Sequence, residues 1–231
     1  AESIQAIAEE AGLVVNVAYV DGDDLLPRIA DLKAAGVELV NLDTGVALAD
    51  SGHDVVTANA YLGAWGIKEA LDAGADVVIA ARVTDAAVVI GPAAWKFNWQ
   101  RDDYDALAGA LAAGHIIECG TQATGGNYSF FQEVPTFTKI GFPLAEIEAD
   151  GAFTITKHPG TGGIVNTGTV TAQLLYEIGQ PAYLNPDVIG HFDTMTIDDQ
   201  GNDRVRVSGT RGSSPTPTHK VCINLFGGFK S

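Results

Sequence analysis

Hydrophobic and polar residues follow a pattern that occurs three times in the first half of the chain. Each occurrence has apolar residues at helical spacing, then an Ala-Gly pair, then a short apolar run that ends in polar residues. The three occurrences span residues 29–45, 67–85 and 105–122. Because glycine readily adopts the left-handed conformation that ends many helices, each pattern predicts a helix followed by a buried strand. The predicted strands are 37–42, 76–81 and 115–119, and the apolar run 13–20 predicts a fourth.

The second half of the chain has a different pattern, typical of antiparallel hairpins. Asp150-Gly151 separates two alternating segments, which is a strong signal for a β-hairpin. Residues 192–212 predict a second hairpin, and residues 218–226 predict a further strand. Between the hairpins, a helical spacing of apolar residues predicts a helix. Val170, Leu174 and Ile178 form its apolar face, and Gly179 marks its expected end.

Helix–glycine–strand units in series are typical of a parallel α/β sheet, whereas hairpins beside a helix are typical of an α+β arrangement. The sequence therefore predicts an α/β fold with two parts. Residues 1–125 form the parallel α/β part, and residues 126–231 form the hairpin-rich α+β part. We expect the two parts to pack as one domain.

The composition indicates a globular protein and limits its partners. Hydrophobic residues make up 46% of the chain and charged residues 18%, and the formal net charge is −16. This charge repels nucleic acid and anionic membranes, so we expect neither as a partner. The opening segment is amphipathic and acidic, unlike a signal peptide. The two cysteines, Cys119 and Cys222, lack metal-site spacing and predict reduced thiols in a cytoplasmic protein.

Polar residues follow the three predicted strands at their carboxyl ends, where open parallel sheets bind ligands. The candidates are Asp43 and Thr44, then Arg82, Thr84 and Asp85, then Glu118 and Gln122. Arg82 is one of only 13 basic residues, and it suits either a clamp on an anion or an internal pair with Asp85 or Asp43. Glu118 suits a general base. For Cys119, a buried structural thiol is favoured over a nucleophile.

Two glycine-rich loops are further candidates. In residues 119–131, Gly125 and Gly126 allow a ligand to approach the backbone, and Asn127 suits a contact to a carbonyl group. A loop that simply crosses between the two parts is the alternative. The second loop precedes the predicted helix and suits either an anion site or a tight turn; it matches neither the P-loop nor the dinucleotide fingerprint. Its candidate residues are His158, Gly160, Thr161, Gly162 and Gly163.

Three long motifs resemble the N-terminal domain of the acyclic terpene utilisation family, AtuA. They are "TANAYLGAWGIKEALDAGADVVIAARVTDAA", "GHIIECGTQATGGNYSF" and "TKHPGTGGIVNTGTVTAQLLYEIG", the last followed by "YLNPDV". The chain departs from the expected pattern at Ala81 and Thr121, where Gly and Ala are usual. The resemblance implies that the chain is a fragment of a longer protein. It also implies a role in the breakdown of citronellol- and geraniol-type compounds, which proceeds through acyl-CoA thioesters.

Two hypotheses of different classes follow from these residues and this resemblance. The first is an enzyme with a lyase- or hydratase-like step on an acyl-CoA or branched carboxylate. Arg82 would hold an anionic group, Glu118 or Asp85 would move a proton, and Asn127 would stabilise an oxyanion. The second is a non-catalytic scaffold or partner of a pathway enzyme. We expect a small anionic ligand, with CoA as part of the substrate. Binding of Mg²⁺ by Asp43, Asp85 and Glu118 is an open alternative. Assembly into a homo-oligomer is a further open alternative.

Overall fold

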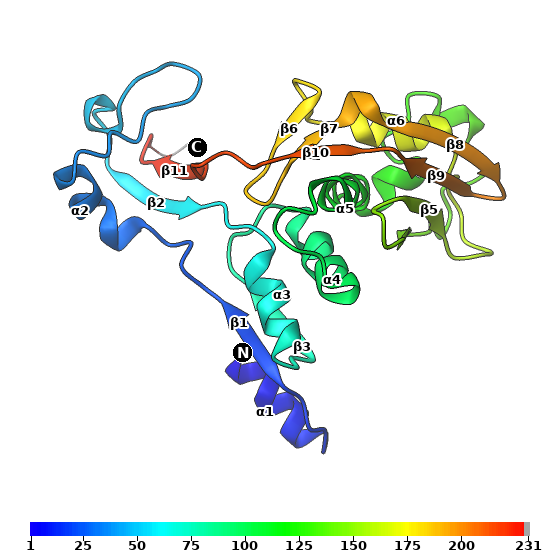
Figure 1. Ribbon diagram of the computed structural model, residues 1–231, viewed down its shortest axis with the longest axis horizontal. Helices are drawn as coiled ribbons and strands as arrows, with labels where there is room; N and C mark the ends of the chain where they lie inside the picture. Colours follow the sequence, from blue (N-terminus) through cyan, green and yellow to red (C-terminus); the bar gives the residue numbers. More distant parts are fainter. Residues whose placement is uncertain (229–231) are drawn as a thin grey trace.

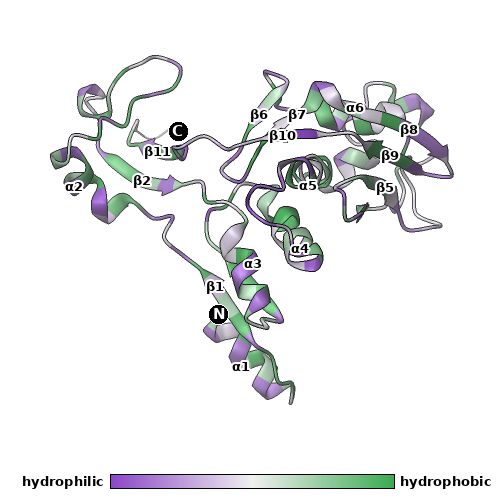
Figure 2. Ribbon diagram, viewed as in Figure 1, coloured by the Kyte–Doolittle hydropathy of each residue, from purple (hydrophilic) through white to green (hydrophobic). Residues whose placement is uncertain are grey.

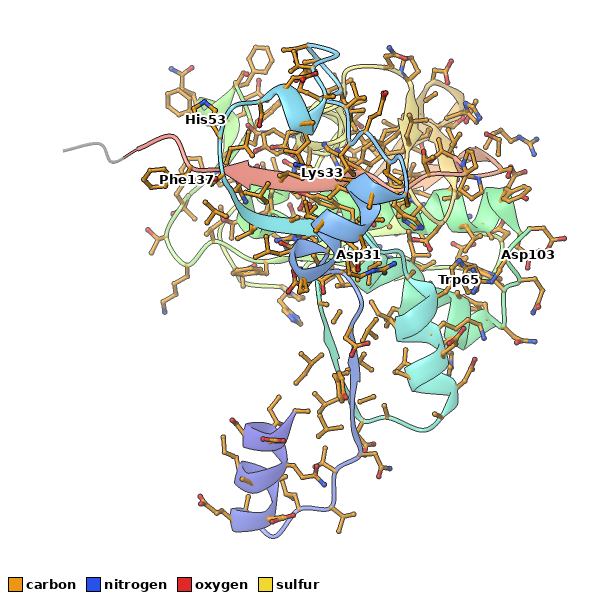
Figure 3. All side chains as sticks on the ribbon, turned by 90° about the vertical axis from the view of Figure 1, so that its left-hand side faces the viewer. Asp31, Lys33, His53, Trp65, Asp103 and Phe137 are labelled. Atoms are coloured by element: carbon orange, nitrogen blue, oxygen red, sulfur yellow. The ribbon has the colours of Figure 1, made fainter. Side chains whose placement is uncertain are left out.

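The computed structural model describes residues 1–228 and contains three regions around a pair of packed helices. Figure 1 shows an arm at the N-terminus, a small lobe near the C-terminus, and a larger body that holds most of the strands. The arm consists of α1 (Glu2–Glu10), β1 (Val17–Val20) and β3 (Val77–Ala80). Figure 3, turned by 90°, shows α1 standing apart from the rest of the molecule. No helix among the described residues is long and apolar enough to cross a bilayer.

The predicted parallel pairing is confirmed for two of the four expected strands. β1 pairs with β3 in parallel, with Val17 opposite Val77 and Val20 opposite Ala80. Helix α3 (Trp65–Asp72) precedes β3 and ends before Gly74, which has the positive φ of 83° expected after a helix. The unit built around Gly74 is therefore a helix, a glycine and a strand, as the pattern predicts, although this strand is half-buried and not buried.

The predicted strand 37–42 is wrong, because a local turn forms in its place. The Asn41 side-chain oxygen accepts the N–H groups of Asp43 and Thr44, at 3.0 and 2.9 Å. Such turns compete with strand formation, since the side chain supplies the partner that a ladder would supply. Only Val40 makes an isolated bridge, to Ala47.

The predicted strand 115–119 is also wrong, because helix α5 (Tyr104–Ile117) covers its first three residues and a turn follows. Gly114 lies inside this helix and not at its end. A Cβ atom at Gly114 would lie 2.8 Å from the Cα of Ala86, so the glycine serves close packing of α5 on the start of α4 (Ala87–Phe97). Residues 107–116 are all buried, which explains why the apolar pattern resembled a buried strand.

The small lobe is formed by segments from opposite ends of the chain. β2 (Val55–Ala60) pairs in antiparallel fashion with β11 (Val221–Leu225), which confirms a strand in the predicted region 218–226. The short helices η1 (Leu26–Arg28), α2 (Ile29–Ala34) and η2 (Leu48–Asp50) lie beside them. The core of this lobe is Ile29, Leu48 and Ala58.

The body is built around α5, which lies between two antiparallel sheets (Figure 1). Both predicted hairpins are confirmed within the four-stranded sheet, whose order is β4-β5-β9-β8. Its strands are β4 (Pro143–Ile147), β5 (Phe153–Lys157), β8 (Thr196–Gly201) and β9 (Arg204–Ser208). The three-stranded sheet, in the order β10-β7-β6, contains β6 (Ala182–Leu184), β7 (Ile189–His191) and β10 (Arg211–Ser213). Figure 2 shows hydrophobic residues along α4, β5 and β9.

Helix α6 (Thr167–Leu175) confirms the helix predicted between the hairpins, although it ends four residues before Gly179. Asn166 caps its start by accepting the N–H of Thr169. At its end, Tyr176 turns to extended backbone, so Ile178 lies beyond the helix. The short helices η3 (Gly120–Thr124), η4 (Phe131–Glu133) and η5 (Phe192–Thr194) complete the body. The fold is thus α/β, with one small parallel sheet and antiparallel sheets elsewhere.

Candidate functional site

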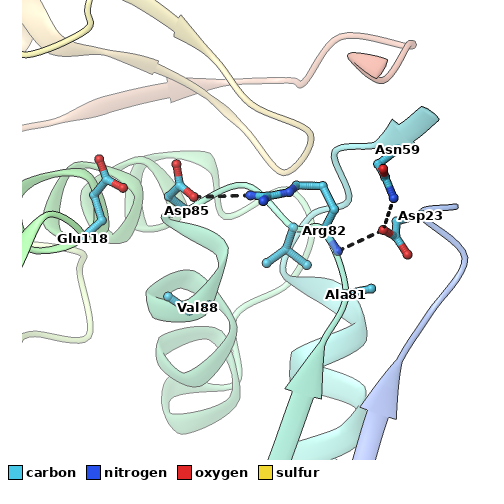
Figure 4. A pocket seen from close by; sticks show the side chains of 8 residues that line it. Asp23, Asn59, Ala81, Arg82, Asp85, Val88 and Glu118 are labelled. Atoms are coloured by element: carbon cyan, nitrogen blue, oxygen red, sulfur yellow. Dashed lines mark hydrogen bonds and ion pairs between the residues drawn. The ribbon is translucent and has the colours of Figure 1, made fainter. Parts of the chain in front are cut away.

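A cleft of about 570 Å³ lies at the carboxyl end of the parallel strand pair, and we call it the first cleft. The chain leaves β3 at Ala80 and passes through its wall before entering α4. Figure 4 shows side chains from four segments that meet there. They are Asp23, Asn59, Ala81, Arg82, Val83, Asp85, Val88 and Glu118. The structure therefore brings together three of the predicted residues, Arg82, Asp85 and Glu118.

The two carboxyl groups of the first cleft differ in their surroundings. Glu118 follows the end of α5 and is partly buried, and this burial raises its pKa; the nearby charges of Asp85 and Glu177 add to the shift, while the Cys119 thiol opposes it. Asp85 is 61% exposed in its side chain and lies 3.9 Å from Arg82, oxygen to nitrogen. Two neighbouring carboxyl groups with unlike environments are suited to different protonation states.

Arg82 lies between the carboxylate of Asp85 and an aromatic ring. Its guanidinium carbon is 5.5 Å from the centre of the Tyr61 ring, and half of its side chain is exposed to solvent. The pair with Asp85 is long, so the planar donors of Arg82 are open to a further anion. The sequence left a clamp and an internal pair as alternatives, and this geometry permits both.

Asp23, which follows β1, and Asn59 of β2 also line the first cleft. An oxygen of Asp23 accepts the Asn59 amide at 2.8 Å and the backbone N–H of Arg82 at 3.2 Å. Burial acts to raise the pKa of Asp23, but these hydrogen bonds outweigh it and lower the pKa. Asp23 is not among the predicted site residues, although it follows the predicted strand 13–20 as the others follow theirs.

Cys119 is a protonated thiol and not an activated nucleophile. Burial raises its pKa to about 11, and the hydrogen bond and charge of Glu118 add to the effect. Its sulfur donates to an oxygen of Glu118 at 3.4 Å. The structural interpretation of Cys119 thus agrees with its surroundings, because a reactive cysteine needs a lowered pKa.

A second cavity of about 350 Å³ adjoins the first cleft, and Asp85 lines both. Its walls come from the segment after β3, the turn between β6 and β7, and residues 216–220 before β11. They include Thr84, Tyr61, Tyr183, Asn185 and Lys220. Thr84 was predicted as a site residue, whereas the others were not. The signal for two of them was present, since "YLNPDV" holds Tyr183 and Asn185.

Asp43 and Thr44 lie elsewhere, in a hollow of about 490 Å³ on the small lobe. They share it with apolar residues of the β11 region and not with Arg82 or Glu118. The structure thus separates Asp43 from the other two carboxylates proposed for Mg²⁺. Within residues 1–228, no group of three His, Cys, Asp or Glu side chains is arranged to hold a metal ion.

The predicted residues of the first glycine-rich loop lie within and directly after η3. The Asn127 amide donates to the side-chain oxygen of Gln173 at 3.4 Å. Gly125 has a φ of 119°, which favours glycine, and the N–H of Gly126 donates to the Thr121 carbonyl. The Gln122 side-chain oxygen is buried. These residues lie outside the lining of the first cleft and of the second cavity.

The second glycine-rich loop uses its N–H groups within the chain. Gly162 and Gly163 donate to the carbonyls of Lys139 and Thr136, and the Thr161 carbonyl accepts the Lys157 ammonium at 3.0 Å. A Cβ at Gly162 would lie 2.4 Å from a backbone carbonyl oxygen, so glycine allows the close approach of two chain segments. Gly160 has a φ of 77°, and His158 is exposed. Of the two alternatives, this geometry favours the tight turn.

The fold and the first cleft define a mixed α/β protein with an acidic, arginine-containing site at the end of a parallel strand pair. A model of the family described as acyclic terpene utilisation family protein AtuA matches residues 1–231, the whole chain. The chain therefore belongs to the AtuA family, as the three motifs predict. No curated protein and no solved structure matches it significantly.

Proposed function

We propose that the chain forms the acid–base site of an enzyme that adds or removes water on a branched acyl-CoA or carboxylate. The observation that supports this most is the pair of carboxyl groups in the first cleft. Glu118, with its raised pKa, is suited to donate a proton, and the exposed Asp85 is suited to accept one. Membership of the acyclic terpene utilisation family supports a branched, terpene-derived substrate.

The proposed step is the dehydration of a 3-hydroxyacyl group or its reverse. Asp85 removes the proton from the carbon next to the carbonyl, and that electron pair forms the new double bond. The bond to the hydroxyl oxygen breaks as Glu118 protonates it, and water leaves. Asp85 is then protonated and Glu118 ionised, and a proton passed back between these neighbours restores the starting state. Arg82 holds a phosphate of CoA or a carboxylate at the cleft.

The first prediction tests the two carboxyl groups separately. Glu118→Gln and Asp85→Asn keep the size of each side chain and remove its proton transfer. Each should lower kcat for 3-hydroxyacyl-CoA dehydration by about 10²- to 10⁴-fold. The measurement is steady-state turnover by the full-length protein over a panel of chain lengths. Glu38→Gln, on an exposed residue of the small lobe, is the matched control and should turn over normally.

The pH profile provides a second readout of the same variants. If Glu118 acts as the acid, kcat/KM of the wild type falls as the pH rises through the raised pKa of Glu118. Glu118→Gln should flatten this limb, whereas Glu38→Gln should leave it in place. Unchanged turnover in both Glu118→Gln and Asp85→Asn would overturn the acid–base assignment, whereas absence of turnover by the wild type would favour the non-catalytic partner.

A further inference from the structure

The second cavity is lined by both apolar and polar residues. Its lining includes Leu184, the last residue of β6, Pro186 from the turn that follows, and Tyr61. Thr84 and Asn185 line it from the segments after β3 and β6. A concave site with apolar walls and a few converging polar groups is typical of small-molecule binding.

Two buried polar atoms, each on a residue that lines this cavity, have no hydrogen-bond partner within the described chain. They are the Thr84 hydroxyl oxygen and the Asn185 amide nitrogen. Asn185 is only 4% exposed, so its amide is shielded from bulk water. Buried polar groups are rarely left unpaired, and each such case calls for an explanation. A ligand oxygen that accepts from both donors supplies one.

The groups around these donors indicate what kind of ligand fits. Burial raises the pKa of Tyr183, so its phenol stays protonated. Lys220 lies 5.8 Å from the Tyr61 ring centre, and a His219 nitrogen lies 3.1 Å from the Tyr61 carbonyl oxygen. In a chain with net charge −16, these basic residues favour an anionic or carbonyl-bearing ligand at this mouth.

We infer that the second cavity holds the acyl group of the substrate. Its carbonyl oxygen accepts hydrogen bonds from Asn185 Nδ2 and Thr84 Oγ1, and its short branched chain packs on Leu184, Pro186 and Tyr61. The inference deepens the proposed function, on which it rests for the role of Asp85. Because Asp85 lines both spaces, an acyl group here places its neighbouring carbon beside the acid–base pair. The same two donors would stabilise the enolate oxygen.

The test uses 3-methylbutanoate, whose carboxylate oxygens occupy the position of the carbonyl and which does not react. We expect saturable binding to the full-length protein by isothermal titration calorimetry. Asn185→Leu and Thr84→Val should each weaken it at least tenfold, because each removes one donor at nearly constant volume. Thr154→Val, on a buried threonine of β5, is the matched control and should bind as the wild type does. The ammonium analogue 3-methylbutylamine, with donors only, should not bind.

Thermal unfolding of the same variants separates binding from folding. Removal of an unpaired buried group should leave the melting temperature unchanged or raised, so lost binding at an undiminished melting temperature supports the inference. If Asn185→Leu fails to fold, Thr84→Val decides alone. Absence of saturable binding, or equal binding by wild type and both variants, would overturn the inference. A further outcome is that these variants lose binding while Glu118→Gln leaves turnover unchanged. This outcome would support the acyl site and refute the acid–base proposal.

Discussion

Asp187 is a buried carboxylate that joins the two halves of the chain. Its two oxygens accept the backbone N–H of Ala64 at 2.9 and 3.0 Å, at the start of α3. A negative charge is favourable at a helix N-terminus, and the carboxylate satisfies a donor that the helix leaves unpaired. Burial nevertheless raises the pKa of Asp187 to about 6. Desolvation therefore outweighs the hydrogen bonds at this residue.

This balance predicts a pH dependence of stability. The pKa of Asp187 is about 6 in the folded protein, above its ordinary value of 3.8. Between pH 3.8 and about pH 6, the folded protein therefore binds more protons than the unfolded protein. The stabilising contribution of Asp187 is thus complete below about pH 4 and is lost as the pH rises through about 6. Asp187→Asn keeps an acceptor for Ala64 and removes the titration. The free energy of unfolding of the variant relative to the wild type should therefore rise with pH, by on the order of 2–3 kcal/mol.

Urea unfolding of both proteins at pH 4 and pH 7 measures this relative change on either side of the pKa of about 6. Taking the difference between proteins cancels the titration of carboxylates they share. Asp102→Asn, on an exposed residue, is the control and should show a constant difference from the wild type. A difference for Asp187→Asn that does not change with pH would contradict the raised pKa.

Single residues were predictable where their position in a strand decided their role. Arg82 and Asp85 follow a strand that exists, and the strand-end argument placed them in one cleft. Glu118 was predicted to follow a strand, but it follows the helix α5. It still lines the first cleft, because the end of α5 lies at the same edge. Asn185 and Asp187 lie in the "YLNPDV" motif, but the distant segments that bury them are not evident from the local pattern.

At the scale of elements, glycines in the body mark contacts between helices and hairpins. A Cβ at Gly109 of α5 would lie 2.0 Å from the carbonyl oxygen of Gly151, at the turn of the β4–β5 hairpin. The sequence predicted this hairpin turn from Asp150-Gly151, and its apolar pattern predicted a helix over part of α5. The sequence did not reveal that the hairpin turn and α5 are in contact. A glycine within a helix can be recognised as a packing position only when the segment that packs against it is known.

Gly109→Ala should therefore destabilise the protein, although alanine favours helix over glycine. The new methyl group meets backbone atoms, which a change of rotamer does not move aside, so we expect a loss of about 3 kcal/mol in the free energy of unfolding. Chemical denaturation gives this value directly. Gly179→Ala is the matched control, because Gly179 has no neighbour within 4 Å and no positive φ. Equal stability of the two variants would show that α5 and the hairpin are not in this contact.

At the scale of the whole molecule, the sequence predicted the fold class but placed too many strands in the parallel sheet. Helix–glycine–strand repetition is real around Gly74, whereas Gly36 leads into an Asn41-centred turn and Gly114 into continued helix. A short apolar run does not distinguish a buried strand from a buried helix. The antiparallel half was predicted well because hairpin turns have local signals. The division at residue 125 stays a prediction.

The hydrophobic cores of the described chain differ greatly in size. The small lobe has three buried core residues, Ile29, Leu48 and Ala58. The cluster around α4 and the first part of α5 has 14, and the cluster around the four-stranded sheet has 11. Local opening is easiest where few apolar side chains are buried. The β2–β11 pair should therefore open without the rest of the molecule.

Hydrogen exchange followed by mass spectrometry tests this together with the acyl site. Amides of β2 and β11 should exchange faster than those of α5 and β9 in the free protein.

The second cavity is lined by Tyr61 and Lys220, which adjoin these two strands, and by Thr84 and Asn185 from the body. A ligand held between them favours the closed lobe, so 3-methylbutanoate should slow exchange in β2 and β11 and leave α5 unaffected. In Asn185→Leu the same addition should change nothing. Slower exchange in that variant would place the ligand elsewhere, and uniformly slow exchange without ligand would show that the small lobe unfolds only with the body.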